Sequence, residues 1–416
     1  MEYTYSRRSL IQLAGTAALL RNAAAAPSAA LRQHIDANWF RKTLAAECEH
    51  WLKASDTPNG FFRPSISRDW RPVGQQVATL TSQSRQIYIR ALGYELTRNP
   101  AYLESVKKGA DFLLANFRDS QYGGMFFSVN PEGKVVDDRK DSYGTAFAIF
   151  GLSHAARVAR DDRYRKAALE TWAQMKKGLR DQAGFYKLST TRDYSEARGT
   201  LSQNPMMHLF EALLALRDAT KSKEIFSEAE AHGNAMFTKL FQDKGGYLPE
   251  VYDANWKPLP VSERGRIDLG HQFEWAFLWS HGVRQRFPKR YLQFGERVLD
   301  YGMKVAYDTA NGGIFSVGDY ERNATKGPKG LWQQCEFLRA LMHYAALRDH
   351  RELWEPFDKS LEFFKRNFMD AEYGGCFSSY DPNKPREGSR LNKNGIDCYH
   401  VCGMYEEALR LTGVLR

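Results

Sequence analysis

Residues 123–127 read Gly-Gly-Met-Phe-Phe, and a glycine followed closely by aromatic residues recurs five more times along the chain. The last glycines of the six copies are separated by 64, 60, 62, 67 and 62 residues. A period this regular indicates a repeat architecture. The copies are Gly60-Phe61-Phe62, Gly123-Gly124-Met125-Phe126-Phe127, Gly184-Phe185-Tyr186, Gly245-Gly246-Tyr247, Gly312-Gly313-Ile314-Phe315 and Gly374-Gly375-Cys376-Phe377.

The segments between these motifs have helical patterns of two kinds. Each motif is followed by a segment that is apolar almost all round, such as 143–150, and then by one with a single polar face, such as 102–117 or 221–240. A helix that is apolar all round is buried, whereas an amphipathic helix lies at the surface. Six inner and six outer helices predict an all-α (α/α)6 barrel with short β-turn loops at its mouth. An open solenoid is the alternative, which the lack of capping repeats disfavours.

The composition is that of a soluble globular protein. The chain has 416 residues, of which 43% are hydrophobic and 26% charged, and this excludes a disordered or collagenous chain. Aromatic residues make up 13%, which suits large buried interfaces or a sugar-stacking cleft. The net charge of +10 comes from basic residues interleaved with acids, so we expect no nucleic-acid partner.

The N-terminus has the pattern of an export signal. Arg7-Arg8 precede an apolar stretch to Leu20, and small residues follow from Ala23 to Ala26. This arrangement resembles a twin-arginine signal over residues 1–26. It predicts a periplasmic or exported mature protein, 27–416, made of one barrel domain; the protein is cytoplasmic if the signal is spurious. The apolar stretch is too short for a permanent membrane anchor.

The sequence gives little support to a metal or cofactor. Five cysteines do not make a disulfide framework. Cys398-Tyr399-His400-Val401-Cys402 lacks zinc-knuckle spacing, and a helix would turn His400 away from the face of the two cysteines. No P-loop, dinucleotide fingerprint or Gly-x-Ser-x-Gly motif occurs. We therefore expect neither a metal nor a cofactor.

Titratable residues recur at nearly the same distance along the chain from the last glycine of a motif. His208 lies 24 residues after its glycine, and Arg85, His271 and His400 each lie 25 residues after theirs. Buried imidazole and guanidinium groups cost free energy unless they are paired. Their convergence at one end of a barrel lumen predicts an active site. The two remaining repeats place four other residues near this level, namely Tyr143, Phe147, Trp332 and Glu336.

The sharpest local motif is 270–275, Gly-His-Gln-Phe-Glu-Trp. His271 and Glu274 are three residues apart and share a helix face. A carboxylate beside an imidazole raises the pKa of the imidazole and orients it, which suits a general acid or base. The spacing is not the two-histidine motif of zinc proteases.

These blocks, with 207–212, Ser84-Arg85-Gln86 and Tyr399-His400, resemble the N-acylglucosamine 2-epimerase family, which includes cellobiose 2-epimerases and mannose-type aldose–ketose isomerases. The resemblance implies an (α/α)6 barrel and proton transfer at C2 of a hexose or N-acylhexosamine through an enediolate. It implies that His271 and His400 are the acid/base pair, that Arg85 supports the enediolate and that Glu274 supports its neighbour. It further implies no cofactor, a monomer or homodimer, and substrate contacts from His208, Tyr143, Lys140, Asn204, Trp332 and Glu336.

The sequence departs from the family where Gly395 replaces a sugar-stacking tryptophan and where Cys376 replaces another. These changes leave the sugar undetermined, as well as the choice between epimerisation and isomerisation. An (α/α)6 glycoside hydrolase or polysaccharide lyase is the alternative. A hydrolase needs two opposed carboxylates, and the inner-helix register offers only Glu274 and Glu336. A non-enzymatic sugar-binding barrel is a third possibility.

Overall fold

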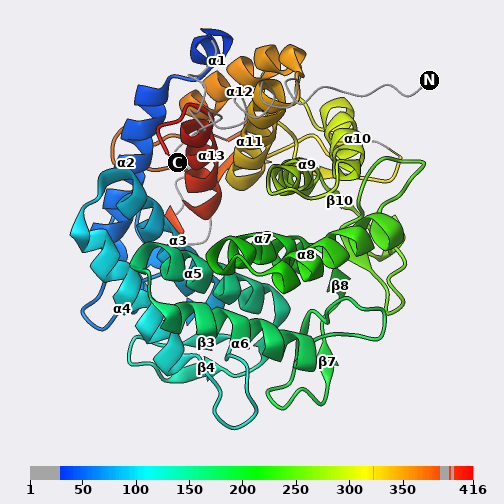
Figure 1. The fold of residues 1–416 in the computed structure, drawn as a ribbon. Helices are drawn as coiled ribbons and strands as arrows, with labels where there is room; N and C mark the ends of the chain where they lie inside the picture. Colours follow the sequence, from blue (N-terminus) through cyan, green and yellow to red (C-terminus); the bar gives the residue numbers. More distant parts are fainter. Residues whose placement is uncertain (1–28, 322, 385–392, 395–397, 416) are drawn as a thin grey trace, which may run out of the picture.

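Six inner helices form a closed ring in the computed structural model, which describes residues 29–321, 323–384, 393–394 and 398–415 (Figure 1). Each inner helix contacts the next, and the last contacts the first, so the ring has no open edge. Almost every residue in their N-terminal halves is buried. The inner helices are α3 (Leu80–Thr97), α5 (Ser142–Ala159), α7 (Gln203–Thr220), α9 (Leu269–Arg284), α11 (Leu331–Leu347) and α13 (Cys398–Leu411).

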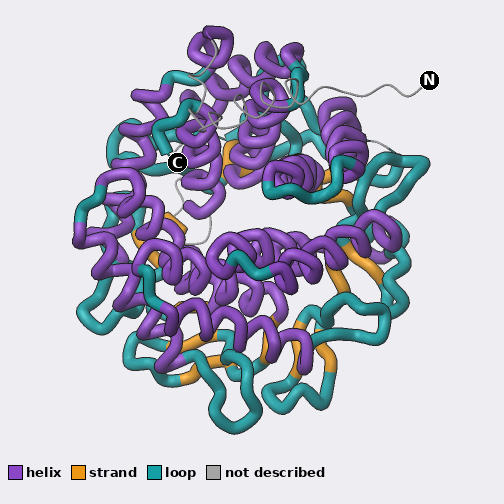
Figure 2. The backbone as a smooth tube through the Cα atoms, in the orientation of Figure 1, coloured by secondary structure: helices purple, strands orange, loops and turns teal. Residues whose placement is uncertain are grey.

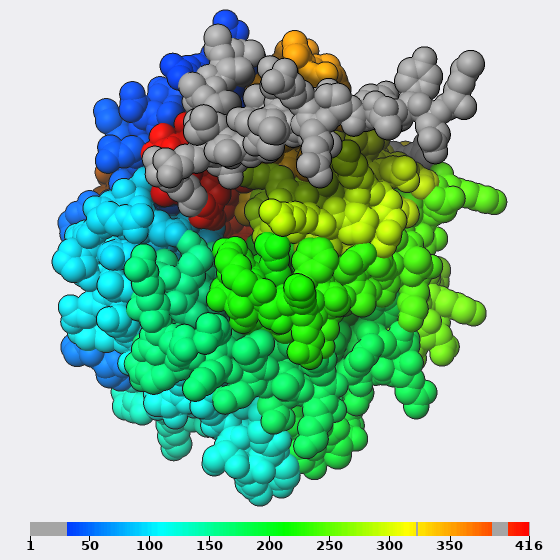
Figure 3. All heavy atoms as spheres, viewed as in Figure 1, coloured from blue at the N-terminus to red at the C-terminus, as the bar shows by residue number. Residues whose placement is uncertain are grey.

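The outer helices cover this ring, and the two ends of the chain close it together. The first outer helix packs beside the last inner helix as well as beside α3. Figure 3 shows the blue and red ends of the chain side by side on the surface. The outer helices are α2 (Ala37–Ser55), α4 (Pro100–Asn116), α6 (Asp162–Gly178), α8 (Lys223–Ala235), α10 (Arg290–Val305) and α12 (Trp354–Asn367). Short helices occupy Ala29–His34 (α1), Met236–Leu240 (η1), Val261–Glu263 (η2) and Arg351–Leu353 (η3).

Short antiparallel strands join each repeat to the next at the end of the barrel where the inner helices begin. Figure 2 shows them spread among the loops instead of gathered in one sheet. The pair β14–β1 joins the last repeat to the first, so the strands close a ring as the helices do. The inter-repeat pairs are β2 (Ala78–Thr79) with β3 (Ser128–Val129), β5 (Lys140–Asp141) with β6 (Ser189–Thr190), β8 (Leu201–Ser202) with β9 (Val251–Tyr252), β10 (Ile267–Asp268) with β11 (Val317–Gly318), β12 (Lys329–Gly330) with β13 (Ser379–Tyr380), and β14 (Lys393–Asn394) with β1 (Ser65–Ile66). Two further strands, β4 (Val135–Asp137) and β7 (Ala197–Arg198), extend two of these sheets.

Backbone geometry explains the glycine repeat. The last glycine has a positive φ in each of the motifs, including 87° at Gly60 and 72° at Gly313. A Cβ added at Gly60 would lie 2.1 Å from the carbonyl oxygen of Lys108 on the outer helix. Only glycine tolerates both the left-handed conformation and this close approach.

Glutamines on the inner helices hold the glycine loops in place. In the first repeat Phe62 donates its backbone N–H to Gln83 Oε1 at 3.0 Å, and Gln83 Nε2 donates to the carbonyl of Gly60 at 2.8 Å. Gln272 bonds in a similar way to the N–H and carbonyl of Leu248 in the fourth repeat, and Gln334 to those of Ile314 in the fifth. Because a buried amide satisfies two buried backbone groups each time, the start of the inner helix is fixed against the loop.

The predicted closed (α/α)6 barrel is confirmed, and the open solenoid is not formed. The expected export signal at 1–26 and the substitution at Gly395 lie outside the described residues. Within the described residues, no helix combines the length and the apolar character that crossing a membrane requires.

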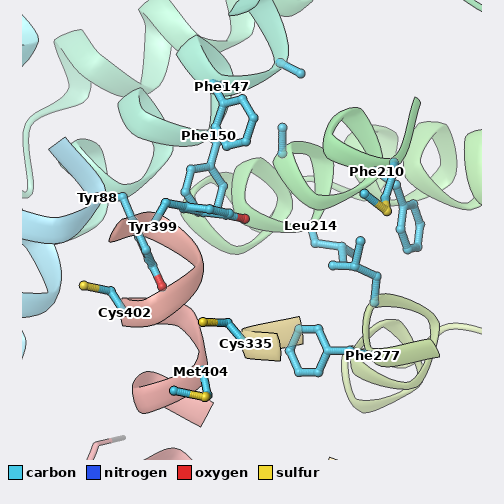
Figure 4. Close-up of a cluster of buried hydrophobic side chains, with 14 of the residues drawn as sticks. Tyr88, Phe147, Phe150, Phe210, Leu214, Phe277, Cys335, Tyr399, Cys402 and Met404 are labelled. Carbon is cyan, nitrogen blue, oxygen red and sulfur yellow. The ribbon is translucent and has the colours of Figure 1, made fainter. Parts of the chain in front are cut away.

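A layer of aromatic side chains crosses the middle of the lumen. Tyr88 of α3 and Tyr399 of α13 lie 5.5 Å apart between ring centroids, and Phe150 of α5 contacts both. Figure 4 shows these rings gathered between the helices, with Phe147 above Phe150 and Phe277 across the cluster on α9. We call Tyr88, Phe147, Phe150 and Tyr399 the aromatic layer. Phe147 and Tyr399 lie against His208 and His400 near the starts of the inner helices, whereas Tyr88 and Phe150 line a cavity on the side of the C-terminal halves.

Candidate active site

The four residues found by their common offset lie on different inner helices at one end of the lumen. Arg85, His208, His271 and His400 come from the first halves of α3, α7, α9 and α13, and each is at most 5% exposed. The rings of His208 and His400 are 6.4 Å apart. Trp332 of α11 lies beside two of the imidazoles, with centroid distances of 4.8 Å to His271 and 5.3 Å to His400. The structure therefore brings the register residues into one cluster.

Each of the three histidines is held at Nδ1 by a carboxylate. The distances are 3.1 Å from His208 to Glu211, 2.7 Å from His271 to Glu250 and 2.8 Å from His400 to Glu336. A carboxylate on Nδ1 fixes the ring orientation and favours a proton on that nitrogen. Nε2 is then the ring atom left for chemistry.

The carboxylate partner of His271 differs from the sequence-based expectation. Its Nδ1 bonds to Glu250, on the loop before β9, and not to Glu274. Glu250 also accepts hydrogen bonds from Ser202 Oγ and Gln203 Nε2, both at 2.9 Å. Three bonds hold this carboxylate, so the imidazole has a rigid anionic support. Glu250 was missed because it lies on a loop, outside the helical register.

Glu274 occupies a different place in the cluster. It is fully buried, and neither carboxylate oxygen has a hydrogen-bond partner among the described residues. Its nearest imidazole is His208, with 3.8 Å between Glu274 Oε1 and His208 Nε2. Burial, and then the neighbouring charge of Glu336, raise the pKa of Glu274 well above its usual value. The neutral form of Glu274 is therefore favoured relative to an exposed carboxyl.

The two predicted acid/base histidines have opposite electrostatic surroundings. Burial disfavours the charged form of His271, but Glu250 and Asp268 outweigh it and raise its pKa to about 10. Burial, reinforced by the charge of Arg85, lowers the pKa of His400 well below 6.5. At neutral pH His271 is a cation and His400 is neutral, so the pair offers one acid and one base.

Arg85 lies against aromatic rings beside the histidines. Its Nη2 donates to the hydroxyl of Tyr143 at 2.8 Å. Its guanidinium lies 4.1 Å from the ring centroid of Phe147 and 4.5 Å from that of Tyr399. These contacts place a fixed cation next to the imidazoles.

Lys140 and Asn204 have different positions. The ammonium of Lys140 forms a buried ion pair of 2.8 Å with Asp119, which also binds Arg192. Lys329 and Asp308 form the same pair three repeats later, again at 2.8 Å, so this contact belongs to the repeat. Lys140 is thus engaged by Asp119, and the substrate contact that the resemblance implies for it stays a prediction. Asn204, in the first turn of α7, has a buried Oδ1 with no partner among the described residues.

Two groups of side chains could in principle hold a metal ion. His208, Glu211 and Glu274 have ligand atoms within 4.8 Å of one another, as do Glu274, Glu336 and His400. In both groups the imidazole Nδ1 already bonds to a carboxylate. The arrangement is thus explained by hydrogen-bonded acid–imidazole pairs. Cys398, two residues before His400, accepts a hydrogen bond from Gln86 of α3. It therefore does not share the Glu336 partner of His400.

The other end of the lumen holds a cavity of about 390 Å³. It is lined by the C-terminal halves of the inner helices and is rich in arginine. Glu211 and Arg339 line it from the side of the aromatic layer, and Arg284 lies at its exposed rim. The remaining arginines of its lining are Arg157 and Arg410. We call this cavity the far chamber.

A closed (α/α)6 barrel with acid–imidazole pairs at one end of its lumen defines the class of the protein. The sequence profile of the N-acylglucosamine 2-epimerase (GlcNAc 2-epimerase) family matches residues 60–404. The chain belongs to this family, and it is a carbohydrate epimerase or isomerase.

Relatives across the family agree with this assignment. The chain is 24% identical to a D-mannose isomerase of Marinomonas mediterranea, over 91% of this chain and 96% of that protein. It is 24% identical to a cellobiose 2-epimerase of Bacteroides fragilis, over 79% of this chain and 87% of that protein. A crystal structure of a D-mannose isomerase has a TM-score of 0.81 at 22% identity and covers 90% of this chain and 97% of that one. The structure of a cellobiose 2-epimerase from Spirochaeta thermophila has a TM-score of 0.80 at 23% identity, and it covers 91% of this chain and 97% of that one.

Proposed function

We propose that the chain moves a proton at C2 of an open-chain aldohexose, with His400 as the base and His271 as the acid. The observation that carries this proposal is that His271 and His400 both lie against Trp332, each held at Nδ1 by a carboxylate, while their pKa values are shifted in opposite directions. A neutral Nε2 on His400 accepts the C2 proton, and a cationic His271 donates one. Loss of that proton turns the aldehyde into an enediolate.

Arg85 supplies the fixed positive charge that an enediolate requires. A preorganised cation in a site closed to water stabilises a developing oxyanion more than solvent does. The bond from Arg85 to Tyr143 and its aromatic contacts restrict its motion. The site therefore has a base, an acid and an oxyanion partner.

For the substrate, we propose a free hexose of the mannose, glucose and fructose group. Two observations favour it. The D-mannose isomerase relative aligns over nearly the whole of both chains. The resemblance implies a sugar-stacking tryptophan at Gly395 and a further tryptophan at Cys376, and this sequence has neither. A smaller stacking surface favours a monosaccharide over cellobiose.

Proton NMR in deuterated water tests this proposal. The purified protein is incubated separately with D-mannose, D-glucose, D-fructose, cellobiose and N-acetylhexosamines. We expect deuterium at C2 of a monosaccharide, together with either a ketose or the C2 epimer, which identifies the reaction. No C2 exchange with any of these sugars would contradict it.

The hydrolase alternative gains no support from the site. Mannanase structures share the fold, with a TM-score of 0.63 at 11% identity. Glu274 and Glu336 are both fully buried, and Glu336 is bonded to His400. Neither carboxylate is presented to a glycosidic bond. Release of reducing sugar from α-mannan, abolished by Glu274→Gln and Glu336→Gln but retained by His400→Asn, would favour a hydrolase instead.

We also propose that the protein is exported in folded form. The support is the paired arginines, the apolar stretch and the small residues within 1–26. Cell fractionation with N-terminal sequencing tests this. A mature chain that begins near Pro27 in the periplasm is expected, whereas a cytoplasmic chain beginning at Met1 would contradict export.

A further inference from the structure

Arg339 lies between the two ends of the lumen. It is on α11, one helical turn after Glu336, and is 8% exposed. Its guanidinium lies 3.8 Å from the ring centroid of Phe277 and lines the far chamber. Such a buried cation in the middle of an apolar helix requires an anionic partner.

That partner is the carboxylate that holds the proposed base. Glu336 Oε1 is 2.8 Å from His400 Nδ1, and Glu336 Oε2 is 3.5 Å from Arg339 Nη1. One fully buried carboxylate thus contacts an imidazole on one side and a guanidinium on the other. The order from the far chamber to the active site is Arg339, Glu336, His400.

The surroundings of Glu336 show what Arg339 does for it. Burial is the largest influence on the pKa of Glu336 and raises it, the charge of Arg339 is the largest influence in the opposite direction, and the pKa that results is about 7. The ionisable groups around the pair come from every neighbouring inner helix. They are Arg85 on α3, Tyr143 on α5, His208 and Glu211 on α7, Glu274 on α9, Arg339 on α11, and Tyr399 and His400 on α13. Without Arg339, the carboxyl would face two other acids in a buried place and would take up a proton.

We propose that Arg339 is a positioning residue, which keeps Glu336 ionised so that His400 carries its proton on Nδ1 and presents an unprotonated Nε2. The role in turnover rests on the proposed function. When Glu336 is ionised, the Glu336–His400 pair holds one proton, on Nδ1. When Glu336 is protonated, the pair holds two: Glu336 donates to Nδ1, and the imidazole proton moves to Nε2. The base is then blocked.

The experiment is nitrogen-15 NMR of the histidine rings at pH 8.5, above the pKa of about 7 that Glu336 has with Arg339 in place, with the His400 signals assigned by their loss in His400→Gln. The wild type should show a protonated Nδ1 on His400. Arg339→Met should move the proton to Nε2, while Arg339→Lys should keep it on Nδ1. Arg284→Met is the matched control, because Arg284 lines the same chamber but does not contact Glu336. It should leave the His400 signals unchanged.

Kinetics provide the second measurement. Arg339→Met should lower kcat about 100-fold at pH 7, within the usual range for general base catalysis. KM should change little. The acid limb of the kcat–pH profile should move to higher pH, because without Arg339 the Glu336 carboxyl loses its proton only at a higher pH. Arg339→Lys should restore most of kcat. A purely structural role for Arg339 would not move the pH profile.

The proposal is overturned if wild-type His400 carries its proton on Nε2, a result that needs no variant to fold. It is also overturned if Arg339→Met retains the wild-type ring signals and pH profile. If no sugar is turned over but the ring proton moves as expected, the proposed function fails and the positioning role of Arg339 is supported. If sugars are turned over and the ring proton does not move, the positioning role fails alone.

Discussion

The two ends of the lumen are built from the same six helices but carry different side chains, and the far chamber holds four acids (Glu211, Asp218, Glu406 and Glu407) beside its arginines. The starts of the inner helices hold the histidine cluster, whereas their C-terminal halves hold the far chamber with its four arginines. A helix has partial positive charge at its N-terminus and partial negative charge at its C-terminus. A ring of parallel helices therefore favours anions at one end and cations at the other.

This difference explains why the reaction is expected at the histidine end. An enediolate is an anion, and the N-terminal ends of six helices favour negative charge there. At the other end, arginines near the helix C-termini complement the negative ends and pair with acids, as Arg284 does with Glu407 and Arg410 with Glu406. The far chamber is thus explained by helix electrostatics, apart from Arg339, which lies near the middle of its helix.

The largest expected effect is at the histidine end. Replacing His400 or His271 by asparagine keeps polarity and approximate volume, so folding should be retained. Each variant loses a group that transfers a proton, and turnover should fall by roughly 10²–10⁴-fold. Steady-state kinetics, with circular dichroism as the folding control, measure this. Near-normal turnover in both variants would refute the acid/base assignment.

The next largest effect concerns the rim of the same end. Lys140→Met leaves Asp119 with one of its two basic partners, and breaking a buried ion pair costs about 3–5 kcal/mol. Denaturant unfolding should show this loss, with KM unchanged because Lys140 is engaged by Asp119. Lys329→Met is the matched variant, since it breaks the equivalent pair with Asp308. A raised KM with unchanged stability in Lys140→Met alone would show that Lys140 binds substrate.

The fold could be predicted from the sequence because its requirements are local and repeated. Each glycine motif needs a positive φ, and each inner helix is apolar all round, so the sequence records both features six times. Closure followed from the number of repeats. The pairing of β14 with β1 and of α13 with α2 joins segments more than 300 residues apart, and no local pattern specifies it.

The candidate site was predictable only where its residues share the helical register. The offsets identified Arg85 and the three histidines, which the structure brings together. Glu250 lies on a loop, and its contact with His271 depends on how that loop packs. A spacing of three residues predicts that a histidine and a glutamate pair on one helix face. This holds for His208 and Glu211 but not for His271 and Glu274. Periodicity gives the helix face, and packing decides which partner lies opposite.

A smaller effect is expected in the pH dependence of stability. The pKa of His271 is raised to about 10 in the folded protein, above its usual value of 6.5. A raised pKa stabilises the fold fully below the unfolded value, and the stabilisation is lost as pH rises through the folded value. His271 should therefore contribute a decline on the order of 1 kcal/mol per pH unit between about pH 7 and pH 9. Glu250→Gln should reduce this slope, with the remainder due to Asp268, and urea unfolding at several pH values measures it. An equal slope in the variant would show that Glu250 is not the source of the shift.

The smallest effect is expected at the rim of the far chamber. Arg284 is 37% exposed, and its Nη1 lies 3.4 Å from Glu407, which keeps a 2.8 Å bond to His343 when the arginine is removed. Exposed ion pairs contribute about 0–1 kcal/mol, so Arg284→Gln should change unfolding free energy by no more than that. Because Arg284 does not contact Glu336, kcat should also stay within about twofold of the wild type, in contrast to Arg339→Met. Thermal unfolding and steady-state kinetics on both variants measure the contrast. A large loss of kcat in Arg284→Gln would mean that the two ends are coupled by contacts other than Arg339 and Glu336.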